Sequence, residues 1–329
     1  MDTFGTLFRV HIFGESHGEC VGAVLDGVPP GLALNVEDFL PDLARRNPAN
    51  LAGTTPRKES DIPHIKTGVF RGFTTGAPLT VLFYNRDVDS SKYEYLRATP
   101  RPGSADLTAK QKYCGFNDYR GGGHFSGRLT VSLVAAGVVA KKIVPEIRFC
   151  SEVVSAGGSK DVEKEVLRAL EEGDSIGGVV ECRAKGVPVG LGEPFFNSVE
   201  SVISHILFSI PAVKAVEFGE GIKGAASRGS EFNDPIVSVK GAKATNNSGG
   251  IEGGISDGSD IHLKVYIKPP ASIAKEQRTI NLDTGKCVDV SVKGRHDACI
   301  ALRAPVVVEA SVAVALADLY LVKKAYERE

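Results

Sequence analysis

Apolar and polar residues alternate along several short stretches of the chain, a pattern that predicts half-buried β-strands. The stretch 7–13 has this period, and Cys20–Leu25 is a second short strand close behind it. The tight turn Gly14–Gly18 separates the two, so we expect a hairpin with polar groups at its tip. Much later in the chain, Asp260–Lys268 alternates in the same way and is ended by the proline pair Pro269 and Pro270.

Other stretches repeat their apolar positions at a spacing of three and four residues, which is typical of helices. Asn35 is a candidate N-cap for a helix that ends near Arg46. Leu129–Val144 is apolar nearly all round and predicts a buried central helix. Between residues 47 and 119 the sequence is irregular, and we expect long loops there rather than helices. Three further helices, which we expect to be amphipathic, cover about 162–170, 199–207 and 310–327.

The order of these elements indicates the fold class. Strands and helices follow one another without regular alternation and without a repeat of 20–50 residues. This order favours an α+β layered sandwich of helices and antiparallel sheets over a doubly wound parallel sheet. No linker divides the chain, so we expect a single domain over residues 1–329.

Charge and cysteine content narrow the functional classes. The 39 basic and 40 acidic residues give a formal net charge of −1, which excludes the overall cationic surface of a nucleic-acid-binding protein. The six cysteines form no C-x-x-C pair, so we expect no metal site or disulfide framework but reduced, cytoplasmic thiols. The sequence has no signal-peptide pattern and no apolar run of about 18 residues, and we therefore expect no membrane contact.

The turn Gly14–Gly18 carries a hydroxyl, Ser16, beside an imidazole, His17. It matches the G-x-S-x-G pattern of an esterase nucleophile elbow, but that motif needs a helix after the turn and a strand follows here. His17 is instead a candidate general acid; the alternative is a turn histidine bonded to backbone.

A second polar cluster immediately precedes the predicted central helix. Three glycines, 121–123, lead to Arg128, and backbone amides at such a helix entry bind anions. A plain flexible turn is the alternative. The Gly-rich loop 246–256 and the charged run Lys293–Asp297 are further candidates, with a mobile loop and a solvated turn as their alternatives.

The motifs GESHG with LDGVPPG, RPGSADLT, DYRGGGHFSGRLT, SIPAVKAVEFGEG, NNSGGIEGGIS, KPPASI and KGRHDACIALRA, in this order, resemble the chorismate synthase family over about residues 4–320. The resemblance, to the bacterial, monofunctional type, implies the family's layered sandwich and a homotetramer. It also implies a 1,4-anti elimination of phosphate from 5-enolpyruvylshikimate 3-phosphate, giving chorismate in the shikimate pathway to aromatic amino acids. Reduced FMN is required by the family although no net oxidation occurs.

The resemblance also assigns roles by motif position. His17 corresponds to the histidine proposed to protonate the departing phosphate, and Asp297 to the carboxylate proposed to assist proton removal at the flavin. The implied substrate-binding residues are Ser16, Arg45, Arg46, Arg101, Ser126, Arg128 and Arg295. The implied FMN-binding residues are His124, Phe125, Ser126, Gly253, Lys268, Pro269, Pro270, Ala271, Ser272 and Arg295.

The chain departs from the family pattern at several of these places. Ser104 stands where the family has a histidine thought to protonate the reduced flavin, and a serine hydroxyl does not titrate near neutral pH. KPPAS replaces the usual KPTSS, and Ala52 stands where many members have an arginine. A degenerate homologue that binds FMN and a phosphorylated ligand with weak or no turnover is therefore the alternative to an active enzyme. Fungal-type members reduce their own FMN with NADPH; here no reductase domain or dinucleotide-binding fingerprint is found, and we expect an external flavin reductase.

Overall fold

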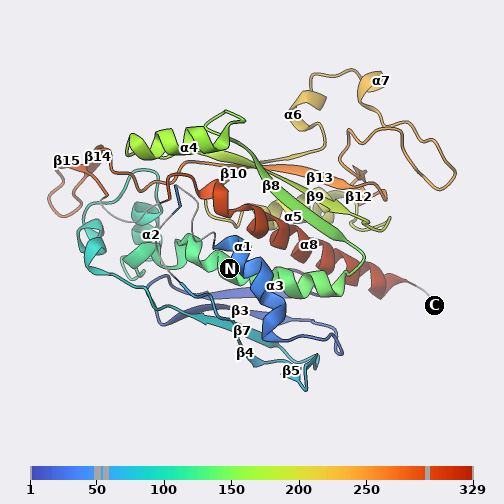
Figure 1. Cartoon of the computed structure of the whole chain (residues 1–329), viewed down its shortest axis with the longest axis horizontal. Helices are drawn as coiled ribbons and strands as arrows, with labels where there is room; N and C mark the ends of the chain where they lie inside the picture. Colours follow the sequence, from blue (N-terminus) through green and yellow to red (C-terminus); the bar gives the residue numbers. More distant parts are fainter. Residues whose placement is uncertain (1, 48–52, 55–58, 293–296, 328–329) are drawn as a thin grey trace.

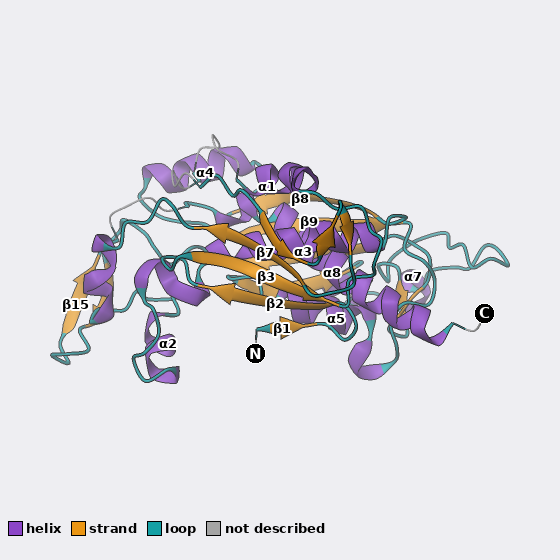
Figure 2. Ribbon diagram, turned by 90° about the horizontal axis from the view of Figure 1, so that it is seen from below, coloured by secondary structure: helices purple, strands orange, loops and turns teal. Residues whose placement is uncertain are grey.

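The computed structural model of the chain describes residues 2–47, 53–54, 59–292 and 297–327. Two antiparallel sheets enclose a central layer of long helices, and Figures 1 and 2 show this layering from two directions. The predicted α+β layered sandwich is therefore confirmed.

The first sheet has five strands in the order β1-β2-β3-β7-β4. The predicted amino-terminal hairpin is confirmed, because β2 and β3 pair antiparallel with Gly14 opposite Val21. The turn between the two strands lies at one end of the sheet, where it contributes to the site described below. The strands of this sheet are β1 Thr3–Phe4, β2 Arg9–Gly14, β3 Cys20–Asp26, β7 Leu79–Tyr84 and β4 His64–Thr67.

The second sheet has four strands in the order β10-β13-β9-β8, and every neighbouring pair is antiparallel. The predicted late strand is β13, whose apolar residues are buried on one face while the alternate positions are partly exposed. The strands of this sheet are β8 Arg148–Ala156, β9 Gly178–Lys185, β10 Val213–Phe218 and β13 Ile261–Ile267.

Helices α3 (Thr130–Ile143) and α8 (Pro305–Tyr326) form the central layer and pack against each other. The predicted buried central helix is α3, which is confirmed. At the crossing, a Cβ on Gly137 would lie 2.3 Å from that of Ala310, so the two backbones approach closely because this position has no side chain.

The prediction for the last helix is corrected in two respects. Helix α8 begins at Pro305, a residue that favours the first helical turn, rather than at residue 310. It is also not amphipathic, because every residue from Val306 to Leu319 is buried between the sheets. Its length and hydropathy match those of a membrane span, but 78% of that window is buried inside the protein, and we interpret α8 as a core helix.

Three outer helices confirm the remaining helix predictions: α1 (Leu40–Arg46), α4 (Val162–Glu171) and α5 (Val199–Leu207). The Asn35 side chain accepts a hydrogen bond from the Asp38 amide, as predicted for an N-cap, although the first turn is a 3₁₀ turn.

The expectation of loops alone between residues 47 and 119 was wrong. Helix α2 (Asp106–Lys112) lies in this region, and so does the 3₁₀ turn Ser91–Arg97. The remaining short elements are β5 Val69–Phe70, β6 Phe73–Thr74, β11 Ile251–Glu252, β12 Ile255–Ser256, β14 Gln277–Ile280, β15 Cys287–Val290, α6 Gly221–Gly224, α7 Gly229–Phe232 and the 3₁₀ turns Val36–Phe39, Arg120–Phe125, Gly127–Leu129, Phe195–Asn197 and Ile300–Arg303.

Candidate active site

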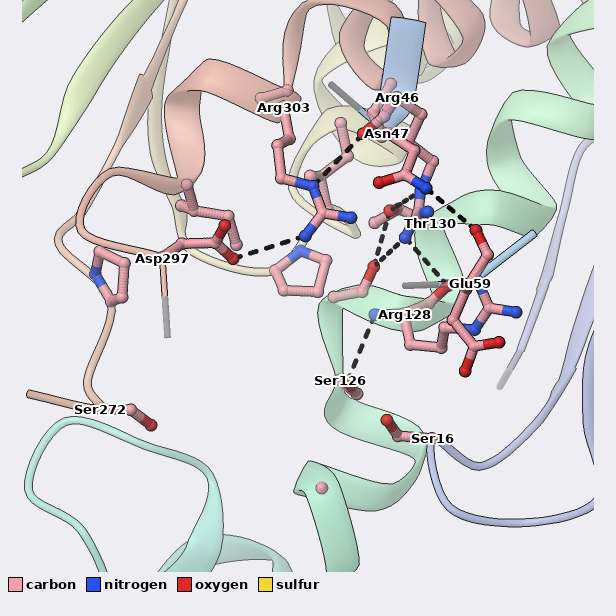
Figure 3. Close-up of a pocket in the computed structure, with 18 of the residues that line it drawn as sticks. Ser16, Arg46, Asn47, Glu59, Ser126, Arg128, Thr130, Ser272, Asp297 and Arg303 are labelled. Atoms are coloured by element: carbon pink, nitrogen blue, oxygen red, sulfur yellow. Dashed lines mark hydrogen bonds and ion pairs between the residues drawn. The ribbon is translucent and has the colours of Figure 1, made fainter. Parts of the chain in front are cut away.

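A cleft opens where the glycine segment before α3, the turn after β2 and the segments after β13 and before α8 come together. It has two chambers. We call the one lined by Ser16, Arg46, Asp61, Arg128, Asp297 and Arg303 the inner chamber (Figure 3). We call the one lined by Arg101, Ser104, His124, Phe125, Lys268 and Ser272 the outer chamber. Both include Gly121, Ser126 and Ile300 in their walls, so the two chambers adjoin.

Two buried arginines of the inner chamber share one carboxylate. Arg46 donates from Nη1 to Oδ2 of Asp61 at 2.9 Å, and Arg128 donates from Nη1 to Oδ1 of the same side chain. All three side chains are only 4% exposed. No sequence pattern identified Asp61, because it lies in an irregular stretch and its partners are distant along the chain.

The two guanidinium groups leave binding capacity for an anion. Nη2 of Arg128 is buried and has no hydrogen-bond partner among the described residues, although buried donors are normally paired. Burial lowers the pKa of Arg46 to about 9, and the positive charges of Arg303 and Arg128 act in the same direction. Arg46 therefore stays protonated at neutral pH, and an anion beside it would stabilise its charge.

Arg303 is a third arginine of the inner chamber, and sequence reasoning missed it. Its Nε donates to the backbone carbonyl of Arg46 at 3.3 Å, and its Nη1 lies 3.6 Å from Oδ2 of Asp297. Asp297 and Arg303 therefore form one wall of the chamber, opposite Arg128 and Ser16 (Figure 3).

The turn that carries Ser16 and His17 closes the other side. Ser16 is 1% exposed, and its amide donates to the Gly123 carbonyl at 3.1 Å. Nδ1 of His17 lies 3.0 Å from Oγ of Ser90, and its ring meets the edge of Tyr93 at 5.1 Å between centroids.

The His17 ring lies directly against the backbone of Gly121. A Cβ on this glycine would lie 2.5 Å from Nε2 of His17, and the residue has a φ of +58°. Only glycine meets both conditions at this position without strain. The imidazole thus packs against Gly121, which belongs to the wall that the two chambers share, while His17 itself lines neither chamber.

The outer chamber is braced by a second buried ion pair. Arg101 donates from Nε and Nη2 to Asp106 at 2.8 and 2.7 Å, and from Nη1 to Oγ of Ser272 at 2.8 Å. Burial raises the pKa of Asp106, but the hydrogen bonds and charge of Arg101 outweigh it and hold that pKa below its usual value. Ser104 closes the same turn, because its Oγ donates to the Arg101 carbonyl and accepts from the Asp106 amide.

His124 faces two acceptors. Its Nδ1 lies 2.8 Å from the carbonyl oxygen of Gly14, and its Nε2 lies 3.1 Å from Oδ1 of Asp2. These two contacts fix the orientation of the ring. On the opposite side of the outer chamber, Nζ of Lys268 donates to the Gly103 carbonyl, which joins the end of β13 to the loop that carries Ser104.

Some residues from the resemblance do not meet at the cleft. Arg45 donates two hydrogen bonds to Glu309 in the core, at 2.9 and 2.8 Å, and this partner raises its pKa. Gly253 lies in the turn between β11 and β12 and lines neither chamber. Arg295 and Ala52 lie outside the described residues.

The esterase alternative lacks its structural context. The turn Gly14–Gly18 connects two adjacent antiparallel strands, β2 and β3, and no helix follows it directly. A nucleophile elbow requires that helix.

Comparisons with known proteins were made on the whole chain. The family model described as chorismate synthase matches residues 8–321. A chorismate synthase of Chitinophaga pinensis is 55% identical over 100% of this chain and 99% of its own length. One from Dehalococcoides mccartyi strain BAV1 is 45% identical, covering 97% of this chain and 96% of its own. A solved structure titled "Crystal Structure of Chorismate Synthase" superposes with a TM-score of 0.72 at 28% identity, over 97% of this chain and 93% of that one. These similarities do not support the alternative of a degenerate homologue.

Proposed function

The chain belongs to the chorismate synthase family and is a carbon–oxygen lyase, and we propose that it eliminates phosphate from 5-enolpyruvylshikimate 3-phosphate with reduced FMN in its cleft. One observation supports this most strongly. The arginine-lined inner chamber, in which Nη2 of Arg128 has no partner among the described residues, adjoins the outer chamber at a wall that contains Gly121, and the His17 ring packs against this glycine. Such a site accommodates a trianionic substrate beside a second, larger ligand.

In this proposal the inner chamber binds the substrate. Asp61 holds both guanidinium groups, and Nε and Nη2 of Arg46 also donate to Thr130 and to backbone carbonyls. Nη2 of Arg128, which has no partner among the described residues, is the donor that we assign to an anionic oxygen of the substrate. Ser16 and Ser126 add hydroxyl groups on the same wall. Because the arginines are fixed before the ligand arrives, little side-chain entropy is lost on binding.

His17 acts as the general acid. Its ring packs against Gly121 of the shared wall and is oriented by Ser90 and Tyr93, and we assign it the protonation of a leaving phosphate held by the neighbouring arginines. Protonation lowers the charge that develops on the departing oxygen. Asp297, held by Arg303, is the carboxylate that we assign to assisting proton removal at the flavin.

The outer chamber fits FMN. The backbone of Gly121–Phe125 forms one wall without bulky side chains over the glycines, and Lys268 and Ser272 supply a cation and a hydroxyl on the other. The two prolines of KPPAS offer no side-chain donor, so Ser272 and backbone amides carry those contacts. When bound, reduced FMN transiently supplies an electron to the breaking carbon–oxygen bond and recovers it as hydrogen leaves the ring.

At position 104 the family has a histidine thought to protonate the reduced flavin, and this chain has Ser104. We assign this protonation to His124 instead. Ser104 is engaged in the turn at Arg101 and cannot supply a proton by titration. His124 lines the same chamber, and contacts to the Gly14 carbonyl and to Asp2 orient its ring. It is therefore the imidazole that we assign to proton transfer beside the flavin.

The remaining features follow from the family. We propose that residues 1–329 act as one domain within a homotetramer, in the cytoplasm, and that an external reductase supplies the FMN in reduced form. The six cysteines, all free, fit a reducing compartment.

The test is an anaerobic assay of the purified protein with chemically reduced FMN and 5-enolpyruvylshikimate 3-phosphate, in which chorismate absorbance and phosphate release are followed together. We expect equal amounts of both products, and none with oxidised FMN. Ser104→His and His124→Asn are assayed beside the wild type: activity in the wild type, loss in His124→Asn and recovery in the double variant support His124. Flavin binding without product in the wild type would contradict the proposal.

A further inference from the structure

Asn85 connects the two halves of the inner chamber. It directly follows β7, and its amide donates to the Glu19 carbonyl at 3.0 Å, which extends the pairing of β3 and β7 by one residue. This register places its half-buried side chain beneath the turn Gly14–Gly18 and next to Arg128. Neither the hairpin motif nor the glycine motif contains this residue.

All hydrogen-bonding groups of the Asn85 carboxamide are used. Nδ2 donates to the carbonyls of Glu15 and Gly18 at 3.0 and 2.9 Å, which are the two ends of the segment that carries Ser16 and His17. Oδ1 accepts from Nε of Arg128 at 3.0 Å.

The chemistry of these partners fixes the orientation of the amide. Turning the group over would bring its two N–H donors against the donor of Arg128, and its carbonyl against two carbonyls. An aspartate here would keep the acceptor for Arg128 and lose both donors to the turn. The position thus requires a side chain that both donates and accepts.

The consequences reach both sides of the proposed reaction. On one side, Asp61 and Asn85 together hold the Arg128 guanidinium by Nη1 and Nε, and Nη2 is left as its one nitrogen without a partner among the described residues. On the other side, the same amide anchors the turn from which His17 extends. The loop that contains Asn85 also supplies Ser90, whose hydroxyl lies 3.0 Å from the His17 ring.

We propose that Asn85 is a positioning residue that sets the general acid His17 and the anion-binding Arg128 in one fixed relation. This inference rests on the proposed function for the roles of these two side chains. Asn85 itself does not touch the reacting atoms.

A double-mutant cycle tests the link to His17. Asn85→Ala releases the turn, and a displacement of about 1 Å at a reacting group lowers kcat by roughly 10–100-fold. If Asn85 acts through His17, the same change in a His17→Ala background lowers kcat by less than about 3-fold. An equal factor in both backgrounds would overturn this part of the proposal. Asn85→Asp is measured in the same cycle and gives the same answer if the alanine variant folds poorly.

Binding of inorganic phosphate, measured by calorimetry without flavin, tests the link to Arg128. Asn85→Ala weakens phosphate binding by about 3–10-fold, because one hydrogen bond to a charged group is lost. Unchanged affinity would overturn this part. The matched control is Asn281→Ala, because the Asn281 carboxamide also holds a turn through two backbone groups, the amides of Asp283 and Thr284, and this residue lines neither chamber. It leaves both readouts unchanged.

The two measurements also separate this inference from the proposed function. A wild-type protein that makes no chorismate contradicts the function, while the phosphate measurement still decides whether Asn85 positions Arg128. Normal wild-type turnover with an unaffected Asn85→Ala variant contradicts the inference alone.

Discussion

The substitution Gly121→Ala tests whether the position of the His17 side chain determines catalysis, because it displaces this side chain while the protein stays folded. The added Cβ would lie 2.3 Å from Cδ2 and 2.5 Å from Nε2 of His17, and 3.0 Å from Oγ of Ser16. Ordinary contacts between such atoms are about 3.5–4.0 Å, so the imidazole has to retreat by about 1 Å. Since the ring is the far end of a flexible side chain, the retreat itself is cheap, and the main effect falls on catalysis.

The magnitudes follow from this geometry. A misplacement of about 1 Å lowers kcat by on the order of 100-fold, which corresponds to about 2.7 kcal/mol of activation free energy. The left-handed backbone at φ +58° adds about 1–2 kcal/mol of destabilisation for a residue with a Cβ. The loss of kcat therefore exceeds what lower stability alone produces in a protein that remains folded during the assay.

Gly157→Ala is the matched control. Gly157 also has a left-handed backbone, with φ +57°, but the nearest atom to its added Cβ is Cδ1 of Ile176 at 3.5 Å, an ordinary contact, and this residue lines neither chamber. Both variants should lose similar unfolding free energy in urea titrations, and only Gly121→Ala should lose about 100-fold in kcat in the anaerobic chorismate assay. Equal kcat in the two variants would refute the placement of the His17 ring against Gly121 of the shared wall.

Three further predictions concern the core, the thiols and the outer chamber. Gly137→Ala forces a methyl group to 2.6 Å from Cα of Ala310 and should lower the unfolding free energy by about 1–3 kcal/mol in denaturant titrations, whereas a stabilised variant would contradict the close helix crossing. Cys114, Cys150 and Cys287 are exposed and should react with a thiol reagent in the native protein; Cys182 and Cys299, whose thiol pKa values are raised by burial, should react only after unfolding. The pair with Arg101 holds the pKa of Asp106 below its usual 3.8. The stabilisation by this pair is therefore present above pH 3.8 and is lost as the pH falls through the lower pKa of the folded state. Because the pair braces the outer chamber, Asp106→Asn should weaken FMN binding at pH 7, measured by flavin fluorescence, and unchanged affinity would argue against the brace.

Local patterns predicted most of the elements that form the cleft. The turn with Ser16 and His17 was predicted because an alternating stretch precedes it and a short strand follows it, and α3 was predicted because its apolar residues leave no polar face. Helix α8 was predicted too short and amphipathic, since Glu309 and Asp318 interrupt its apolar run. Both carboxylates are buried, with Glu309 bonded to Arg45 and Asp318 to backbone amides near the amino terminus, and such distant partners leave no periodic signal.

Several residues in and around the inner chamber could not be predicted from sequence patterns. Asp61, Asn85 and Arg303 contact residues that are distant along the chain. The first two lie in no motif, and Arg303 stands in the motif KGRHDACIALRA without an assigned role. Arg45 and Arg46 are adjacent in sequence, but successive residues of a helix point in directions about 100° apart, so one faces the core carboxylate and the other the cleft. Only the packed structure decides which arginine can meet a ligand.

A crystal structure of the protein with 5-enolpyruvylshikimate 3-phosphate and oxidised FMN, which does not support turnover, tests the central claim most directly. The account predicts an anionic group of the substrate on Arg46 and on Nη2 of Arg128 in the inner chamber, with the flavin ring in the outer chamber and His17 within hydrogen-bond reach of the phosphate. A substrate whose anionic groups contact only Arg101 and Lys268, with the flavin elsewhere, would contradict it.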